Sequence, residues 1–371
     1  MSNRETDFSR LELNLSNCLD NYRYFRSKLD RSTKILVLVK ANAYGHGAVD
    51  FALMMRMAGA DYLAVALPVE GMELRQAGID LPIVVLTAGT DFFDEIIDNH
   101  LEPGIPNLYT LKALVSTLES RGINEFPVHL KLDTGMHRLG FMPGELPDLI
   151  EYLKDCPRVK VKSVYSHLCV AEDPSMDSFT LGQAELFDRG AAMIEDAIGY
   201  HPMLHLLNSA GIERFPRFQH DMVRLGIGIY GISALENVRL KPVASLKVKI
   251  LQIKELTPED GGIGYGQTGV IAPAGTTVAT IPVGYADGID RRLGRGRASF
   301  SLNGHRVPTI GNICMDMCMV DVTGVDCKVG DTVTIFGEDP TVSELAAILD
   351  TIPYEIMASV PRRIERVIVR R

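Results

Sequence analysis

Apolar positions divide the 371-residue chain into two regions of different rhythm. Up to about residue 234, short apolar runs alternate with longer amphipathic stretches. Several of these runs are continuous rather than alternating, which is typical of parallel strands buried on both faces. The runs are Ile35–Val39, Tyr62–Ala66, Ile83–Thr87, Glu102–Ile105, Val128–Leu132, Val159–Tyr165, Met203–Leu207 and Met222–Tyr230.

The stretches between these runs have helical periodicity. Leu108–Arg121 and Thr180–Ile198 each place their apolar side chains on one side, and Gly199 follows the second stretch as a stop signal. Strands separated in turn by helices or loops predict an α/β fold, a (β/α)₈ barrel of the TIM type over residues 10–234. The run Glu102–Ile105 fits a strand least well, because Pro103 lies inside it.

The rhythm changes after residue 235. Strand-like runs are now divided by Gly, Pro, Asn and Asp, which is typical of antiparallel strands joined by turns. We therefore expect residues 235–371 to form a second, mostly antiparallel β domain, and residues 1–9 are candidates to pair with it. The predicted strands are Val243–Leu256, Thr276–Val283, Ala298–Leu302, Met317–Val322 and Thr332–Phe336, with helices over Ser343–Asp350 and Tyr354–Val360.

Composition narrows the range of functions. Lys and Arg number 38 and Asp and Glu 47, so the formal net charge is −9, which argues against a general nucleic-acid binder or docking on an anionic membrane. The six cysteines form no Cys-x-x-Cys pair, and no apolar run is long enough to span a bilayer. The polar first ten residues predict no secretory signal. We expect a reduced, cytoplasmic protein without a membrane segment.

Barrel enzymes carry their chemistry at the C-terminal ends of the strands, so the residues that follow each predicted strand are the first candidates. Lys40 closes the first run, within the segment Val39–Gly47. An amine that is partly desolvated at a barrel mouth has a lowered pKa and can act as a nucleophile or base. On position alone, a lysine that extends its amine from the strand end into solvent is the commoner arrangement.

Asp133 follows the fifth run and opens the tripeptide Asp133-Thr134-Gly135. Aspartic proteases use such a loop, but they need two carboxylates that share a proton. The chain has no second Asp-Thr-Gly or Asp-Ser-Gly, so only a protease built from two identical chains would fit. Lys131 and Arg138, which flank the aspartate, argue against that interpretation.

Three further strand ends carry small or polar residues that suit an anionic ligand. Ser166-His167 follows the sixth run and Asn208-Ser209 the seventh, while the eighth contains Arg224 and the sequence Gly226–Gly231. The glycine spacing matches a dinucleotide-binding motif, but Ile and Tyr alternate with the glycines as in a strand, whereas that motif opens a helix. Glycine lets backbone N–H groups approach a phosphate, and phosphate sites are common after the last two barrel strands. Lysine, arginines and a phosphate site together favour pyridoxal 5′-phosphate bound to a lysine.

Six segments resemble the signatures of the alanine racemases, a family of barrel-type enzymes that depend on pyridoxal 5′-phosphate. The resemblance covers nearly the whole chain, in the expected order. The segments are Val39–Gly47, Leu132–Gly140, Met222–Gly231, Gly264–Gly266, Gly284–Gly288 and Gly311–Asp316.

The resemblance implies interconversion of L- and D-alanine by two bases, which would supply D-alanine for peptidoglycan. Lys40 would attach the cofactor covalently and then act as the base on one face of the substrate α-carbon. Tyr265 would act on the opposite face, and in the family this tyrosine is supplied by the other subunit of a homodimer. Lowering the pKa of a tyrosine from about 10 to about 7 requires roughly 4 kcal/mol, for which His167 and Arg224 are the expected helpers.

The resemblance also implies the remaining contacts, and it implies no metal. Arg224 would face the pyridine nitrogen, and Lys131 matches a position that is carbamylated in some members. Substrate-binding residues would be Arg138, the Met315 backbone N–H and Tyr285 at the entrance, the last from the partner subunit. The expected cofactor-binding residues are Lys40, Tyr44, His167, Asn208, Ser209, Arg224, Gly226, Ile227 and Tyr354.

Two other functions stay open. A racemase for serine or for a broader range of amino acids would share these motifs, although Tyr354 and Met315 favour a pocket for a small side chain. A non-catalytic protein that binds pyridoxal phosphate on the same barrel is the second alternative. Such proteins are single barrels, so a β domain that carries Tyr265 argues against it.

Overall fold

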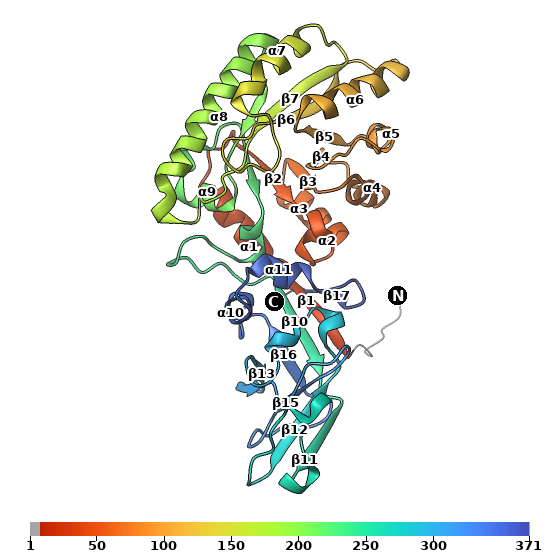
Figure 1. Ribbon diagram of the computed structural model, residues 1–371, viewed down its shortest axis with the longest axis vertical. Coiled ribbons are helices and arrows are strands. Elements are labelled where there is room, and N and C mark those ends of the chain that lie inside the picture. The colour runs from red at the N-terminus through yellow and green to blue at the C-terminus, as the bar shows by residue number, and fades with distance from the viewer. Residues whose placement is uncertain (1–7, 371) are drawn as a thin grey trace. The chain divides into compact units, whose positions relative to one another are not determined.

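The computed structural model describes residues 8–370, which form two compact units. The first, here called the barrel unit, comprises residues 19–43 and 48–240. The second, here called the β unit, comprises the described parts of 1–18 and 241–371, together with 44–47. In Figure 1 the barrel unit carries the labels β2 to β7 and α3 to α9, and the β unit carries β10 to β13 and β15 to β17.

Eight strands form the sheet of the barrel unit, in the order β8-β7-β6-β5-β4-β3-β2-β9 with every neighbouring pair parallel. Two backbone hydrogen bonds join its ends, from Asp221 N to Leu204 O (3.1 Å) and from Arg224 N to Leu207 O (2.9 Å). The predicted barrel is thereby confirmed. The strands are β2 Lys34–Leu38, β3 Tyr62–Val65, β4 Ile83–Val85, β5 Glu102–Ile105, β6 Phe126–Lys131, β7 Val159–Tyr165, β8 Met203–His205 and β9 Met222–Leu225.

Helices follow the strands, and the two predicted from periodicity are present. The helix α6 begins after Asn107, whose side chain accepts a hydrogen bond from Thr110 N, as an N-cap should. The helix α8 ends at Gly199, which has a left-handed φ of 74°. The helices of this part of the chain are α1 Leu15–Arg26, α2 Lys40–Tyr44, α3 Ala48–Ala58, α4 Pro68–Gln76, α5 Phe93–Asp98, α6 Leu108–Ser120, α7 Leu146–Lys154, α8 Asp177–Ile198 and α9 Ser209–Arg214.

The eighth predicted strand is wrong in its second half. The strand β9 ends at Leu225, and Ile227–Tyr230 form a buried 3₁₀ helix. Gly228 is pressed against Phe25, where an added Cβ would lie 2.2 Å from the ring. The chain turns here because only glycine permits that approach. The alternation of Ile and Tyr with glycine reflects this tight turn rather than a strand.

The β unit contains a six-stranded sheet, β14-β13-β16-β10-β1-β17, and a three-stranded sheet, β11-β12-β15. All its strand pairs are antiparallel except β1 with β17, so the mostly antiparallel prediction is confirmed. The elements are β1 Ser9–Asn14, β10 Ala244–Lys249, β11 Gln252–Leu256, β12 Thr276–Ile281, β13 Ser299–Leu302, β14 His305–Pro308, β15 Cys318–Asp321, β16 Thr332–Phe336 and β17 Glu365–Val369, with α10 Val342–Leu349 and α11 Pro353–Ala358.

The strand β1 corrects the expected division of the chain. Five of its six residues, 10–14, fall within the range 10–234 that the sequence assigns to the barrel, yet the strand pairs with β10 and β17. Leu11 and Leu13 are almost fully buried, and Leu11 is in register with Leu246 of β10. Two alternating leucines therefore provide the driving force for its place in the β unit. Of the N-terminal residues expected to pair with this domain, 1–7 lie outside the described residues.

Candidate active site

Lys40 follows β2 almost directly, at the point where the backbone enters a left-handed conformation. The next four residues, Ala41 to Tyr44, all have φ between 50° and 55°, a left-handed turn without glycine. Such a turn costs roughly 1–2 kcal/mol per residue, so its surroundings must hold it. Glu70 contributes by accepting hydrogen bonds from Ala41 N (2.6 Å) and Ala66 N (2.7 Å). The lysine is thereby fixed at the carboxyl end of its strand.

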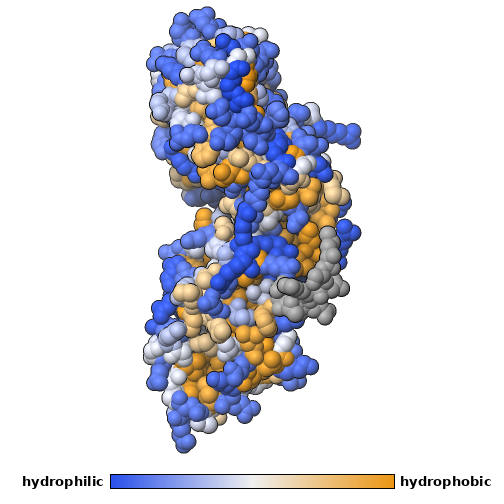
Figure 2. All heavy atoms as spheres, turned by 90° about the vertical axis from the view of Figure 1, so that its right-hand side faces the viewer, coloured by the Kyte–Doolittle hydropathy of each residue, from blue (hydrophilic) through white to orange (hydrophobic). Residues whose placement is uncertain are grey.

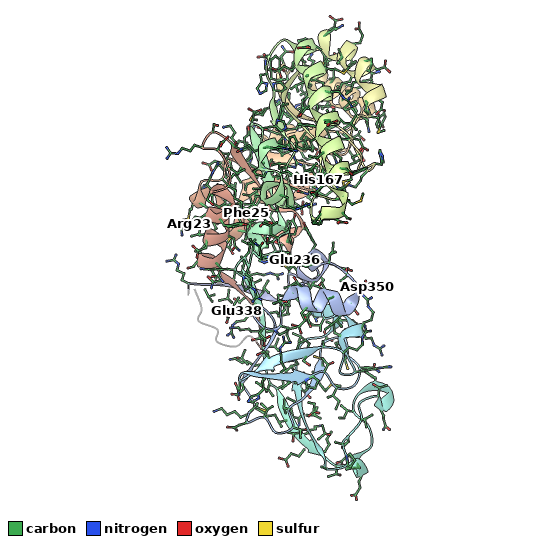
Figure 3. The ribbon with its side chains drawn as sticks, turned by 90° about the vertical axis from the view of Figure 1, so that its left-hand side faces the viewer. Arg23, Phe25, His167, Glu236, Glu338 and Asp350 are labelled. Atoms are coloured by element: carbon green, nitrogen blue, oxygen red, sulfur yellow. The ribbon has the colours of Figure 1, made fainter. Side chains whose placement is uncertain are left out.

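Four cationic side chains meet at this end of the barrel unit. Burial, with the charge of Arg138 beside it, lowers the pKa of Lys40. Burial lowers the pKa of Lys131 to about 8, helped by the charges of Arg138, Arg224 and Lys40. Two amines are thus biased toward their neutral, nucleophilic form. Desolvation and the same positive charges hold the pKa of His167 (labelled in Figure 3) well below its usual value, which keeps this imidazole neutral.

A folded-back loop after β6 carries Arg138. Asp133, the candidate of the protease interpretation, accepts hydrogen bonds from Gly135 N and His137 N, both at 3.0 Å. Its carboxylate is therefore occupied in shaping the loop. Gly140 has φ +126°, and a Cβ there would lie 2.7 Å from Asp133 N, so the loop closes only with glycine.

The ends of β8 and β9 form a cradle of backbone donors. The hydroxyl of Ser209 accepts hydrogen bonds from Gly226 N (3.0 Å) and Gly228 N (3.2 Å). Asn208 caps α9 by accepting from Gly211 N, and its amide donates to Leu168 O. Small residues and backbone N–H groups at this position suit a phosphate. The structure thus brings together the expected phosphate-binding residues of the barrel unit, with Ile227 next in the chain.

Arg224 is buried, and four of its five N–H groups donate hydrogen bonds to other residues of the protein. Its Nη1 donates to the Nδ1 (3.1 Å) and the carbonyl oxygen (2.8 Å) of His205, while its Nη2 donates to Ser166 O and to Leu206 O (2.8 Å). Within the described residues its Nε–H has no hydrogen-bond partner and no carboxylate pairs with it. One N–H of this guanidinium therefore remains for a ligand.

In the β unit, three predicted residues are joined through one loop, 311–316. Asn312 donates from its amide to the carbonyl oxygen of Tyr265 (2.9 Å). Tyr285 N donates to Cys314 O and Ala286 N to Met315 O, both at 3.0 Å. These bonds gather Tyr265, Tyr285 and Met315 on one surface, where all three side chains are exposed. Gly284 makes the approach possible, because a Cβ there would lie 2.2 Å from Cys314 O.

Tyr44 and Tyr354 form a second group in the β unit. Their ring centroids are 5.6 Å apart. The segment that carries Tyr44 is held by Arg366, whose Nη2 donates to Gly45 O at 2.7 Å. Gly45 packs against α11, since a Cβ there would lie 2.1 Å from Met357 O. The two tyrosines predicted to bind the same phosphate are thus neighbours.

The barrel residues fit pyridoxal 5′-phosphate by their chemistry. The cofactor has an aldehyde, a phosphate and a ring nitrogen, which match a desolvated lysine, a backbone cradle and the free N–H of Arg224 respectively. The cationic side chains at this end of the barrel unit, together with carboxylates that are already hydrogen-bonded at Asp133 and Glu70, favour an anionic ligand. Among residues 8–370 no cluster of His, Cys, Asp and Glu could hold a metal ion.

Sequence reasoning missed a set of buried polar residues inside the barrel: Glu102, His129, Ser163 and His205. They lie within or at the start of apolar runs, and barrel interiors are usually filled by branched apolar side chains. Two histidines inside otherwise apolar strands are the signal that could have found them. No described helix combines the length and the apolar character that a membrane span needs.

Comparison with known proteins gives matches over nearly the full chain. The families described as "Alanine racemase, N-terminal domain" and "Alanine racemase, C-terminal domain" match residues 13–234 and 243–368. An alanine racemase of Methanococcus maripaludis is 36% identical over 370 residues, covering 96% of this chain and 97% of that protein. One of Synechocystis sp. is 35% identical, covering 97% and 98%.

Solved structures agree with these matches. An alanine racemase from Clostridium difficile superimposes with a TM-score of 0.91 at 34% identity, covering 99% of this chain and 97% of that one. The alanine racemase from Bartonella henselae, which has covalently bound pyridoxal phosphate, gives a TM-score of 0.88 at 28% identity, covering 98% of this chain and 100% of that one.

Proposed function

Because the chain belongs to the alanine racemase family, whose members depend on pyridoxal 5′-phosphate, we propose that it interconverts L-alanine and D-alanine. The observation that carries this proposal is Lys40, a desolvated lysine at the carboxyl end of β2. It lies within a match that extends over both family domains. When bound, the cofactor supplies an electron-withdrawing ring that eases removal of the substrate α-proton.

The proton is moved by two bases, one on each face of the α-carbon. Lys40 acts on one face, where its lowered pKa leaves more of the amine neutral at working pH. Tyr265 of the partner subunit acts on the other face. Tyr265 is 73% exposed on the β unit and is held through its backbone by Asn312, which leaves its hydroxyl free to reach a second chain. Racemisation needs both, because the proton leaves one face and returns on the other.

The other proposed roles follow from the side chains on each unit. Arg138 binds the substrate carboxylate as a guanidinium fork, and the Met315 N–H binds the same group. Tyr285 lines the entrance. Arg224 donates to the ring nitrogen and cannot readily protonate it, since burial still leaves its pKa at about 10. The phosphate is held by Tyr44, Ser209, Gly226, Ile227 and Tyr354, with Asn208 and His167 completing the cofactor site.

Site sharing implies a homodimer, and the surface of the β unit supports it. Several large apolar side chains around the proposed second base are exposed, and Figure 2 shows hydrophobic surface over the lower part of the view. Large apolar side chains exposed on one unit are typical of a protein interface. The exposed residues include Tyr265, Val270, Tyr285, Met315, Met317, Ile352 and Tyr354.

Lys131 is the proposed site of a carbamate. An amine with a pKa of about 8 is partly neutral near pH 7.5, and the neutral amine adds to CO₂ with loss of one proton. The product is an anion, which would form an ion pair with Arg138 in place of the like-charge repulsion between the two cations.

We place the reaction in the cytoplasm, in the supply of D-alanine for peptidoglycan. The six cysteines are all unpaired, which fits a reducing compartment. A racemase for serine or for several amino acids remains the alternative, since it would use the same two bases. The second alternative, a non-catalytic binding protein, would not need the reactive surface of the β unit.

The deciding experiment is to incubate the protein loaded with pyridoxal 5′-phosphate with L-alanine, D-alanine and L-serine in separate reactions. Chiral chromatography then measures the enantiomers. We expect both alanine enantiomers to approach an equal mixture, with serine converted more slowly. Faster conversion of serine would replace alanine as the substrate, and no conversion of either would favour the non-catalytic alternative.

A further inference from the structure

Five neighbouring strands of the barrel unit contribute to one continuous chain of hydrogen bonds. It begins at Glu102 on β5 and passes through His129 on β6, Ser163 on β7 and His205 on β8 to Arg224 on β9. Each link crosses one pair of neighbouring strands. All five side chains are less than 10% exposed. We call this set the interior relay.

The distances leave little freedom in the relay. Glu102 Oε2 lies 2.8 Å from His129 Nε2, and His129 Nδ1 lies 2.5 Å from Ser163 Oγ. Ser163 Oγ lies 2.8 Å from His205 Nε2, and His205 Nδ1 lies 3.1 Å from Arg224 Nη1. At the Glu102 end of the relay, Lys162 Nζ donates a hydrogen bond to Glu102 Oε1 at 2.6 Å.

Donor and acceptor chemistry fixes the direction of every bond. A guanidinium only donates, so His205 Nδ1 must be the acceptor and its proton must sit on Nε2. That proton goes to Ser163, whose own proton goes to His129 Nδ1, and His129 Nε2 then donates to Glu102. This is the one arrangement in which every polar atom of the relay is satisfied. Arg224 therefore donates at one end, and a carboxylate accepts at the other.

Charge supports the same assignment. Burial and the neighbouring Arg224 hold the pKa of His205 well below its usual value, so the imidazole stays neutral as the relay requires. Burial acts to raise the pKa of Glu102, but hydrogen bonds from His129 and Lys162 lower it below the ordinary value, so this end is ionised. The interior relay thus links a buried guanidinium, which has no carboxylate of its own, to a buried carboxylate.

We propose that Glu102 and His129 are positioning residues for Arg224. Through Ser163 and His205 they fix one N–H group of the guanidinium, while backbone carbonyl oxygens fix three others, so that Nε–H alone is presented to the cofactor ring. The inference rests on the proposed contact of Arg224 with the cofactor. It goes beyond that contact by assigning its control to residues at the opposite end of the relay.

The tautomer of His205 tests the proposal in the unmodified holoenzyme. Protein labelled with ¹⁵N in its histidines and loaded with pyridoxal 5′-phosphate is followed by NMR between pH 6 and 9, with signals assigned by His129→Gln and His205→Gln. We expect His205 to have a neutral ring protonated at Nε2 throughout. A proton on Nδ1 of His205, or a charged His205, would overturn the proposal.

A double-mutant cycle tests the coupling. Glu102→Gln keeps the shape and one acceptor oxygen but removes the charge, and Ser163→Ala cuts the relay in the middle. We expect Glu102→Gln to shift the absorbance maximum of the bound cofactor and to weaken its binding about fivefold, as for neighbours in one network. In the Ser163→Ala background the same change should have neither effect. Equal effects in both backgrounds would refute the coupling.

Glu12→Gln is the matched control. Glu12 is likewise a buried carboxylate that forms ion pairs with two cations, Arg10 and Lys247, but all three residues lie in the β unit, whereas the relay lies in the barrel unit. It should leave the absorbance and the cofactor affinity unchanged, and a shift as large as that of Glu102→Gln would show a general effect of lost buried charge. None of these readouts needs racemisation, so a protein inactive on alanine would contradict the proposed function and leave this test intact.

Discussion

The two units present their reactive groups in opposite ways. In the barrel unit, Lys40, Lys131 and Arg224 are wholly or partly buried, and burial lowers the pKa of each of them. In the β unit, Tyr265 and Met315 are exposed, and hydrogen bonds to their backbone carbonyl groups hold them in place. The barrel unit thus resembles a preorganised site, whereas the β unit resembles half of an interface. Under the proposed function, the barrel unit holds the cofactor and the first base, whereas the β unit presents the second base to another chain.

The largest expected effect comes from removing the barrel nucleophile. Lys40→Ala should abolish covalent attachment of the cofactor and lower racemisation by about 10³-fold or more, as loss of a nucleophile usually does. Borohydride reduction followed by peptide mass analysis should find the cofactor on the peptide containing Lys40 in the wild type. Lys154→Ala, at an exposed lysine of α7, is the control and should behave as wild type. Label on Lys131 instead would refute the assignment.

The next effect separates the two faces of the substrate. Tyr265→Ala should still bind the cofactor and still exchange the α-proton of D-alanine with solvent. Exchange from L-alanine should fall about 10²-fold or more, the usual contribution of a general base. NMR in deuterated water measures both rates.

Tyr109→Ala is the control for this variant, because Tyr109 is 74% exposed and lies on α6, away from every predicted site residue in sequence. It should leave both exchange rates unchanged. Equal losses for the two enantiomers in Tyr265→Ala would contradict one base per face.

A mixture of the two inactive variants tests whether the halves come from different chains. In a mixed dimer one site lacks both residues, while the other has Lys40 from one chain and Tyr265 from its partner. With random pairing, half the dimers are mixed and each has one working site of two. Activity should recover to about one quarter of the wild type. Subunit exchange confirmed by mass spectrometry without any recovery would place both residues of each site in the same chain.

The smallest expected effect concerns Lys131. With a pKa of about 8, the neutral amine makes up about one tenth of the lysine at pH 7 and about one half at pH 8. Added bicarbonate should therefore stimulate racemisation more at pH 8 than at pH 7, by about threefold at most, or ~0.7 kcal/mol. Lys131→Ala should be insensitive to bicarbonate at both pH values. Stimulation that survives in this variant would assign the effect to another group.

Parallel topology explains what the sequence could predict. Once the eight apolar runs are taken as neighbouring parallel strands, residues far apart in the chain such as Lys40, Arg138 and Ser209 must lie at the same end. The interior relay could not be predicted in this way, because its direction depends on which atoms meet across strand pairs. The left-handed turn after Lys40 was equally hidden, since Ala41 and Ala43 have no preference for that conformation.

The place of β1 between β10 and β17 bears on how the protein can be divided. The chain passes between the two units four times, after Cys18, Ala43, Gly47 and Leu240. If the chain were cut near residue 240, the six-stranded sheet of the β unit would lose its inner strand β1. The edges of β10 and β17 would then be unpaired and prone to aggregation. A chimaera that exchanges the β unit between relatives must therefore exchange the N-terminal strand with it, although more than two hundred residues separate the two along the chain.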